Sequence, residues 1–158
     1  MGLNVAFKDI DNVREFLFNG SIDEDFDIND VLSSISKEMI FNLKGINKIT
    51  SFGVKLWIDL LGKIPENCMI SYEECSIPFI NQVNMISNFI QKGEIKTYFA
   101  PFICEDGHEF EKLMNIQDVK FKEGEYLIPK TICPTCKTEC ELDEFPDDFL
   151  AFLSIDDE

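Results

Sequence analysis

Two short stretches rich in cysteine constrain the fold of this chain more than any other feature of its sequence. The stretch FICEDGHEF carries Cys104 and His108, the only histidine of the chain. The stretch TICPTCKTEC follows further along and carries Cys133, Cys136 and Cys140. Structural zinc takes four Cys or His ligands in a tetrahedron, commonly supplied as two closely spaced pairs. If both stretches bind one metal ion, the chain between them must fold back on itself.

The spacing of these residues predicts the ligand set. Cys133 and Cys136 form a C-x-x-C pair, and Cys104 with His108 forms a C-x-x-x-H pair opposite it. Four protein ligands close the coordination shell, so we expect a structural zinc site rather than a catalytic one. Cys140 remains the rival to His108 as fourth ligand, although the alternation in TECELDE is also typical of a buried cysteine in a strand.

A C-x-x-C pair also occurs in redox proteins, where it opens a helix whose N-terminus lowers the thiol pKa. In this chain the pair follows YLIPKTI and precedes another extended-looking stretch, so the sequence does not predict that helix. The motifs of phosphate-binding loops, dinucleotide-binding turns and nucleophile elbows are absent from the sequence. A non-enzymatic protein is therefore favoured, and a zinc- or thiol-dependent enzyme using Cys133 and Cys136 is the alternative.

The charge of the chain argues against nucleic acid as a partner. The chain contains thirty acidic and fourteen basic residues, which gives a formal net charge of −16. Proteins that bind a duplex gain most of their affinity from Lys and Arg on phosphates. The acidity has two remaining interpretations, which are simple solubility and a protein partner with a basic surface.

The start of the sequence, MGLNVAFKDI, lacks the basic and apolar regions of a signal peptide. No apolar run has the length of a membrane-spanning helix. Clustered cysteines are also more typical of a reducing compartment than of a secreted disulfide scaffold. We therefore expect a cytoplasmic protein without membrane insertion.

The pattern of apolar residues predicts an α/β fold with a mixed, partly parallel sheet and packed helices. Strands and helices alternate through residue 102, which is typical of strands joined by crossover helices. The expected strands are two within 3–18, then 38–43, 68–73 and 95–103, and the expected helices are 28–34, 50–64 and 76–90.

The helix expected at 50–64 has an apolar face on which Val54, Trp57 and Leu61 recur at helical spacing. Ser51 stands where an N-cap would lie, and Gly62 where the helix would end.

Three regions follow from this organisation. Residues 1–102 form an α/β core, and residues 103–141 form a cysteine-rich insertion with a small zinc-ribbon-like hairpin. Residues 142–158 form an acidic C-terminal helix that docks on the core through Phe149 and Leu150.

The core resembles a STAS domain, the domain shared by sulfate transporters and anti-sigma factor antagonists. The resemblance is carried by FLFNGSID, by EMIFNLKGINKITSFGVKLWIDLL and by MISYEECSIPFINQVNMI, which give a buried strand, a short turn and an amphipathic helix in the order of that family. The stretch from FAPFIC to ELDEFPDDFLAFL resembles STAS-like proteins that carry a cysteine-rich segment after this core.

The resemblance implies a protein-binding regulatory module whose partner is a kinase-like anti-sigma factor. In the family, a Ser or Thr before the helix is phosphorylated, and Ser51 is the matching position here. Thr50 and Gly53 would join Ser51 in the partner-binding surface, although Thr50 replaces the acidic residue of the family. A plain helix cap at Ser51, in a scaffold protein without a phosphorylation switch, is the alternative.

Overall fold

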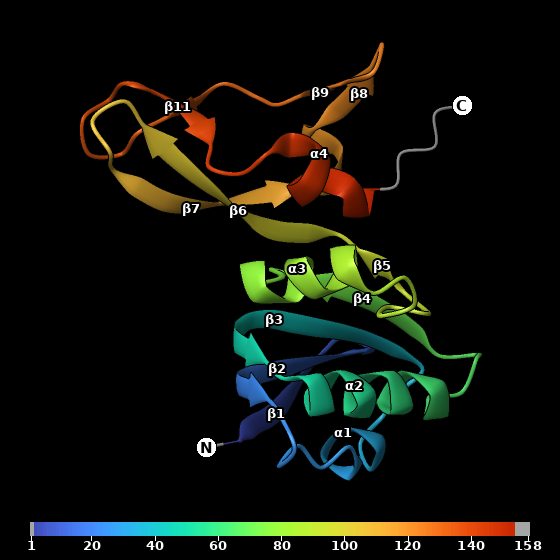
Figure 1. Cartoon of the computed structure of the whole chain (residues 1–158). Helices are drawn as coiled ribbons and strands as arrows, with labels where there is room; N and C mark the ends of the chain where they lie inside the picture. Colours follow the sequence, from blue (N-terminus) through green and yellow to red (C-terminus); the bar gives the residue numbers. More distant parts are fainter. Residues whose placement is uncertain (1, 154–158) are drawn as a thin grey trace.

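A mixed five-stranded sheet forms the N-terminal part of the protein in the computed structural model, which describes residues 2–153 (Figure 1). Its first two strands form an antiparallel hairpin, and each later strand is added in parallel to the one before it. The sequence prediction of a partly parallel sheet is therefore confirmed. In sheet order the strands are β1 (Leu3–Ile10), β2 (Val13–Ile22), β3 (Glu38–Ile49), β4 (Met69–Glu73) and β5 (Glu94–Ile95).

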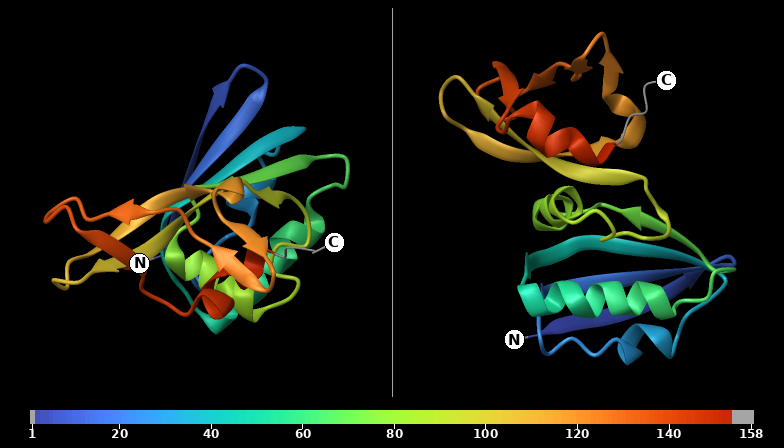
Figure 2. Two further views of the ribbon diagram at one scale, coloured as in Figure 1. Left: turned by 90° about the horizontal axis from the view of Figure 1, so that it is seen from above. Right: turned by 45° about the vertical axis from the view of Figure 1, so that its right-hand side comes forward.

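The connections between the parallel strands are helical. They are α1 (Asn29–Leu32), α2 (Ser51–Lys63) and α3 (Ile77–Met85). Because successive parallel strands lie side by side and crossovers are right-handed, these helices gather on one face of the sheet, as Figure 2 shows.

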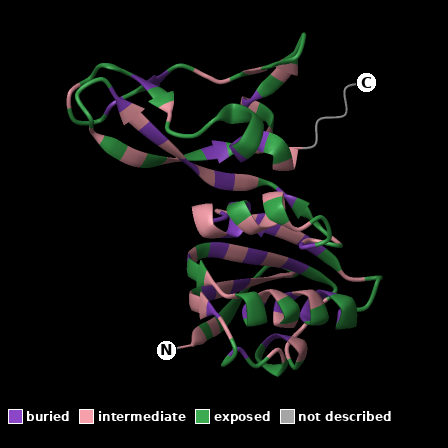
Figure 3. Ribbon diagram, in the orientation of Figure 1, coloured by how far each residue is buried: buried purple, intermediate pink, exposed green. Residues whose placement is uncertain are grey.

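An aromatic cluster fills the space between these helices and the sheet. Trp57 of α2 is fully buried, and its ring lies 5.9 Å from Phe41 of β3 and 5.5 Å from Phe79 of α3. The alternation of buried and more exposed residues along β3 and β6, visible in Figure 3, is the pattern expected of strands with one face on a core.

A second, four-stranded sheet carries Cys104 and Cys140 in its strands, and Cys133 and Cys136 lie in one of its turns. Its strands run in the order β10 (Thr131–Ile132), β11 (Glu139–Leu142), β6 (Thr97–Cys104) and β7 (Glu109–Asn115), and all neighbours are antiparallel. Between β7 and β10 lie a short 3-10 turn, η1 (Ile116–Asp118), and a hairpin of β8 (Lys120–Lys122) and β9 (Glu125–Leu127).

Helix α3 lies between the two sheets and contacts β3 on one side and β6 on the other (Figure 1). The chain ends its described part in α4 (Pro146–Phe149) and η2 (Leu150–Leu153), which also contact α3. Asn84 of α3 donates a 2.9 Å hydrogen bond to the carbonyl oxygen of Phe149, and the ring of Phe152 lies 4.8 Å from that of Tyr98 in β6. The rest of the helix expected at the C-terminus, residues 154–158, lies outside the described residues.

The strand expected at 95–103 is in fact two strands. Ile95 ends β5 in the first sheet, and the chain then crosses at Lys96 into β6 of the second sheet. Ile95 is buried in the first sheet and alternate residues of β6 are buried in the second, so the sequence pattern alone shows no break. The strand expected at 38–43 likewise continues to Ile49 as the long strand β3.

The boundaries of two helices also differ from the sequence prediction. Helix α2 begins as expected, but its N-cap is Thr50 rather than Ser51, and Gly62 lies inside the helix, which continues to Lys63. Helix α3 is capped by Ser76 and ends at Met85, short of the expected residue 90.

Candidate metal centre

The turn between β6 and β7 positions the first pair of expected ligands. Cys104 is the last residue of β6, and its N–H donates to the carbonyl oxygen of His108 at 3.1 Å. The N–H of Gly107 donates back to the carbonyl oxygen of Cys104 at 3.0 Å. Gly107 has a φ of 89°, a conformation that glycine adopts at no steric cost. This tight turn brings the His108 ring back over the Cys104 sulfur.

The turn between β10 and β11 positions the second pair. Cys133 directly follows β10, and its N–H donates to the carbonyl oxygen of Thr138 at 2.8 Å. Its own carbonyl oxygen accepts from the N–H of Lys137 at 3.0 Å. Cys136 lies within this turn and is not at the start of a helix, so the helix dipole that activates thioredoxin-like cysteines is not supplied there.

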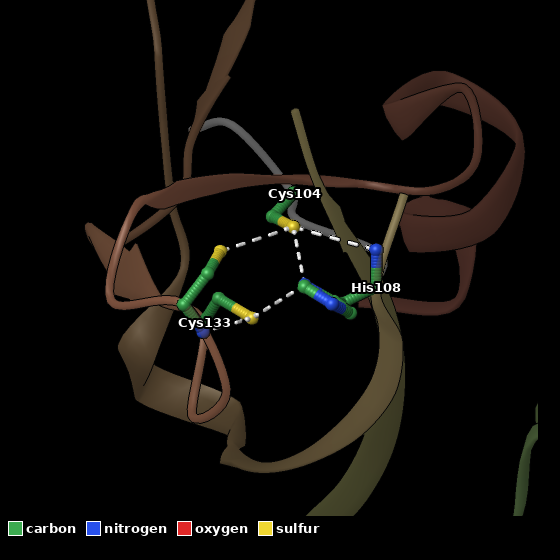
Figure 4. Close-up of side chains that lie close together, drawn as sticks. Cys104, His108 and Cys133 are labelled. Atoms are coloured by element: carbon green, nitrogen blue, oxygen red, sulfur yellow. Dashed lines mark hydrogen bonds between the residues drawn. The ribbon is translucent and has the colours of Figure 1, made fainter. Parts of the chain in front are cut away.

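The structure brings all four expected ligands together. One ligand atom from each of Cys104, His108, Cys133 and Cys136 lies within 4.8 Å of the other three. The Cys104 sulfur lies 3.3 Å from Nδ1 of His108 and 3.5 Å from the Cys136 sulfur, and the Cys133 sulfur lies 3.7 Å from the same Nδ1 (Figure 4). Sulfur ligands at 2.3 Å from a tetrahedral zinc ion are separated by about 3.8 Å. The group is therefore close enough to hold a metal ion.

Backbone N–H groups point at two of the sulfurs. The N–H of His108 lies 3.4 Å from the Cys104 sulfur, and the N–H groups of Thr135 and Cys136 lie 3.4 and 3.5 Å from the Cys133 sulfur. Such bonds stabilise a thiolate, which is the form of cysteine that binds metal.

The pKa values in the cluster reflect these contacts. Burial alone would raise the pKa of Cys104, but hydrogen bonds from the backbone of His108, from the Cys136 thiol and from the backbone of Asp106 lower it to about 6. Contacts with the Cys136 and Cys104 sulfurs raise the pKa of His108, because they stabilise the imidazolium. The pKa of about 6 favours the thiolate form of Cys104 near neutral pH, which is the form that metal ligation requires.

Two residues, Cys140 and Thr138, lie beside the cluster but are not members of the group of four. Cys140 is the register partner of Cys104 on β11, yet it is not one of the four grouped ligands. Burial raises the pKa of Cys140. Thr138 was not anticipated from the sequence, and its hydroxyl oxygen lies 3.0 Å from the Cys136 sulfur. No spacing signal in the sequence could have identified Thr138, because its position depends on how the second turn closes.

The remaining cysteines belong to the first part of the fold. Cys75 is fully buried and Cys68 is partly buried, and burial raises the pKa of Cys75 far above that of an ordinary thiol. All six cysteines lie in the described part of the chain and are free thiols. The ligand group is therefore not competing with a disulfide.

The other candidate residues lie at the start of α2, in the part of the molecule away from the cysteine cluster (Figure 1). The side chain of Thr50 accepts a 3.0 Å hydrogen bond from the N–H of Gly53 and caps the helix. Ser51 is exposed at the first helical position, beside Phe52, whose side chain is 54% exposed. Gly53 is buried, and a Cβ at this position would overlap the carbonyl oxygen of Ile22.

Gly53 therefore permits close packing of α2 on the end of β2, and the structure shows no other use for it. The three residues expected at a partner surface thus divide into a cap, an exposed hydroxyl and a packing glycine. Only Ser51 of the three presents an exposed side chain to a partner.

No protein-family model matches the sequence, and no curated protein matches it. Within residues 2–153, no helix has both the length and the apolar character that are needed to cross a bilayer.

Proposed function

We propose that this chain is a non-enzymatic, protein-binding regulatory module of the STAS-like type, with a zinc-stabilised cysteine segment beside its core. Its partner is a kinase-like anti-sigma factor or an equivalent switch protein, and phosphorylation of Ser51 controls the contact. We place it in the cytoplasm, where its thiols stay reduced.

The observation that carries the regulatory part is the position of Ser51. Its hydroxyl is exposed at the first turn of α2, directly after the long parallel strand β3, which is the position of the phosphorylated residue in the family that the sequence resembles. The adjacent Phe52 adds an exposed apolar group of the kind that protein interfaces use. Together they place an exposed hydroxyl next to an exposed apolar side chain.

A phosphate on Ser51 would act by charge. It adds between one and two negative charges near neutral pH, and the positive end of the helix dipole stabilises it. The cap at Thr50 already satisfies the N–H of Gly53, so the phosphate is not needed to hold the helix. Its charge and bulk would instead change the surface that the partner meets.

Variants of Ser51 test this proposal. Protein carrying Ser51→Asp or Ser51→Ala is used to capture partners from the lysate of its own host, with Ser87→Asp as an exposed control at the end of α3. The proposal expects one captured protein to be lost with Ser51→Asp and retained with Ser51→Ala and Ser87→Asp. Equal capture by all three variants would overturn it.

We propose zinc as the metal because three thiolates and one imidazole are a common ligand set for structural zinc. Zinc bound by Cys104, His108, Cys133 and Cys136 would join the β6–β7 turn to the β10–β11 turn and so fix the second sheet. Native mass spectra of the protein from its own host test this directly. One zinc per chain, lost on acid denaturation and absent from Cys133→Ser, is the expected result, and a zinc-free wild-type chain would contradict it.

A chelation experiment addresses the enzymatic alternative. A catalytic metal keeps an exchangeable position and is readily removed by chelators, whereas a closed four-ligand site retains its metal until its fold opens. We expect chelation to proceed together with loss of the near-ultraviolet circular dichroism signal, because the second sheet opens as the metal leaves. Rapid metal loss with an unchanged spectrum would favour an open site.

A further inference from the structure

A groove of about 730 Å³ runs along the second sheet and reaches Cys140, beside the group of four candidate ligands. Phe102 of β6 and Leu142 of β11 are register partners and form part of its apolar lining, which we call its base. The segment 128–130 lines one side, and Phe145, just before α4, lines the other. The groove therefore lies between elements that the sequence places far apart.

The groove exists because a strand pairing stops early. Strand β10 pairs with β11 through only two residue pairs, Thr131 with Cys140 and Ile132 with Glu139. Continuing that register would place Pro129 opposite Leu142, but proline has no N–H to donate to a ladder. The segment before β10 departs from β11 at this point, and the base of the groove is left open.

The rim of the groove is strongly acidic. Glu139, Glu141, Asp143 and Glu144 line it, and Lys130 is the one basic residue among its lining residues. A smaller hollow on the other side of Phe145 adds two further acids, Glu125 and Asp147, and no base. Acidic residues therefore line both of the hollows that Phe145 borders.

Phe145 is the most exposed large apolar side chain in the described part of the chain, at 77% exposure. It is shared by the groove and the smaller hollow. An aromatic ring surrounded by carboxylates can contact both an apolar side chain and a cation, and such rings act as anchors in protein interfaces. The apolar base, the exposed ring and the acidic rim together define the chemistry of a ligand that could bind in the groove.

We propose that this groove binds an extended basic segment of a partner protein, in which apolar side chains occupy the base and Lys or Arg side chains meet the acidic rim. Charge complementarity carries this choice of occupant, because the rim is acidic and the whole chain has a net charge of −16. The same charge would repel a nucleic acid. This surface is separate from Ser51, so the inference does not depend on the phosphorylation proposed there.

The test uses two fluorescent heptapeptides and measures anisotropy with the full-length protein at 150 mM salt. The first peptide alternates lysine with apolar residues in the order Lys-Leu-Lys-Phe-Lys-Leu-Lys, and the second contains lysine only. Three variants are compared with the wild type. Phe145→Ala removes the exposed ring, Glu141→Lys reverses a rim charge, and Glu66→Lys reverses an exposed charge in the first part of the fold. Circular dichroism and metal content confirm that each variant is folded.

The proposal expects the mixed peptide to bind more tightly than the lysine peptide. Phe145→Ala and Glu141→Lys should each weaken the mixed peptide by about tenfold, whereas Glu66→Lys should change its affinity by less than about twofold. Amide shifts on titration should map to residues 102–103, 128–130 and 139–146.

Three outcomes would overturn the proposal. Equal binding of the two peptides, with equal weakening by Glu141→Lys and Glu66→Lys, would show attraction by net charge alone. Full affinity in Phe145→Ala would exclude the groove as the site. Displacement of the mixed peptide by spermine at equal concentration, with no effect of Phe145→Ala, would identify a small-polyamine site instead.

Discussion

Cys104 and Cys140 are register partners on the adjacent antiparallel strands β6 and β11, yet only Cys104 belongs to the group of four candidate ligands. The difference arises from where each residue stands relative to a turn, because Cys104 is the last residue of β6 whereas Cys140 lies inside β11, after the β10–β11 turn. Cys104 begins the turn that carries His108, whose ring lies 3.3 Å from its sulfur, whereas the sulfur of Cys140 lies 3.8 Å from the carbonyl oxygen of Thr138. Neighbouring positions on a sheet therefore differ in whether their sulfurs belong to the group of four, although the Cys140 side chain still contacts Cys133.

Substitution at Cys104 should remove the metal, whereas substitution at Cys140 should leave the metal content unchanged. Cys104→Ser removes one of four ligands and should reduce the metal content of purified protein from one ion per chain to less than about 0.2, because three-ligand sites bind structural zinc poorly. Cys140→Ser should leave one ion per chain, since Cys140 is outside the group. Elemental analysis of both variants checks this. Metal loss in Cys140→Ser with retention in His108→Ala would instead make Cys140 the fourth ligand.

Metal affinity should fall as the solution is acidified. Metal binds the deprotonated forms of Cys104 and His108, whose folded pKa values are lowered to about 6 and raised above the ordinary value, respectively. Protons therefore compete with the metal at His108 as the pH falls through its raised pKa, and at Cys104 once the pH falls to about 6 and below. Below that pH these two residues alone should lower the affinity by about 100-fold per pH unit, and protonation of the other two thiolate ligands adds to the fall.

A competition titration against a chromophoric chelator between pH 5 and 8 measures this slope. Cys140→Ser serves as the matched control, because its profile should overlay that of the wild type. An affinity that does not change across this range would contradict the assignment of Cys104 and His108 as ligands.

The two pairs of candidate ligands could be predicted from the sequence because each pair depends on local spacing, whereas the approach of one pair to the other depends on the pairing of β11 with β6. A C-x-x-x-H pair and a C-x-x-C pair each close within one turn, so Cys104 reaches His108 and Cys133 reaches Cys136 whatever the surrounding fold. Thr138 and the groove at Phe145 could not be predicted in this way. Their positions depend on how β11 pairs with β6 and on where its pairing with β10 ends.

The cap of α2 gives a second pair of opposite expectations. Thr50 accepts a hydrogen bond from the N–H of Gly53, so Thr50→Ala should lower the free energy of unfolding by about 1 kcal/mol. Ser51→Ala should change it by less than about 0.5 kcal/mol, because Ser51 is exposed at the next position. Urea denaturation monitored by the fluorescence of the buried Trp57 measures both. Thr50→Ser, which keeps a hydroxyl, is the control, and a larger loss in Ser51→Ala would show that Ser51 is the cap.

The same helix shows where sequence patterns stop being sufficient. Its apolar face was predicted correctly around Trp57 and Leu61, because the spacing of buried residues is a local property. Its N-cap was placed one position late, at Ser51 rather than Thr50, since Thr50 and Ser51 are both able to cap a helix. The choice is made by tertiary structure, in which the N–H of Thr50 donates to the carbonyl oxygen of Ile22 at 3.0 Å. That bond between β2 and the helix start has no signature in the sequence.

The two glycines of α2 should respond to alanine in opposite directions. A Cβ on Gly53 would overlap the backbone of Ile22, which cannot move without disturbing β2, so Gly53→Ala should destabilise the protein by about 2 kcal/mol or more. A Cβ on Gly62 would meet no atom within 4 Å, and alanine favours a helix interior over glycine by about 0.5–1 kcal/mol. Gly62→Ala should therefore stabilise the protein by about that amount. Because both changes add the same methyl group to the same helix, the pair separates helix propensity from packing in a single set of urea unfolding curves. Equal shifts of the two midpoints in one direction would show that α2 does not approach β2 as closely as the structure indicates.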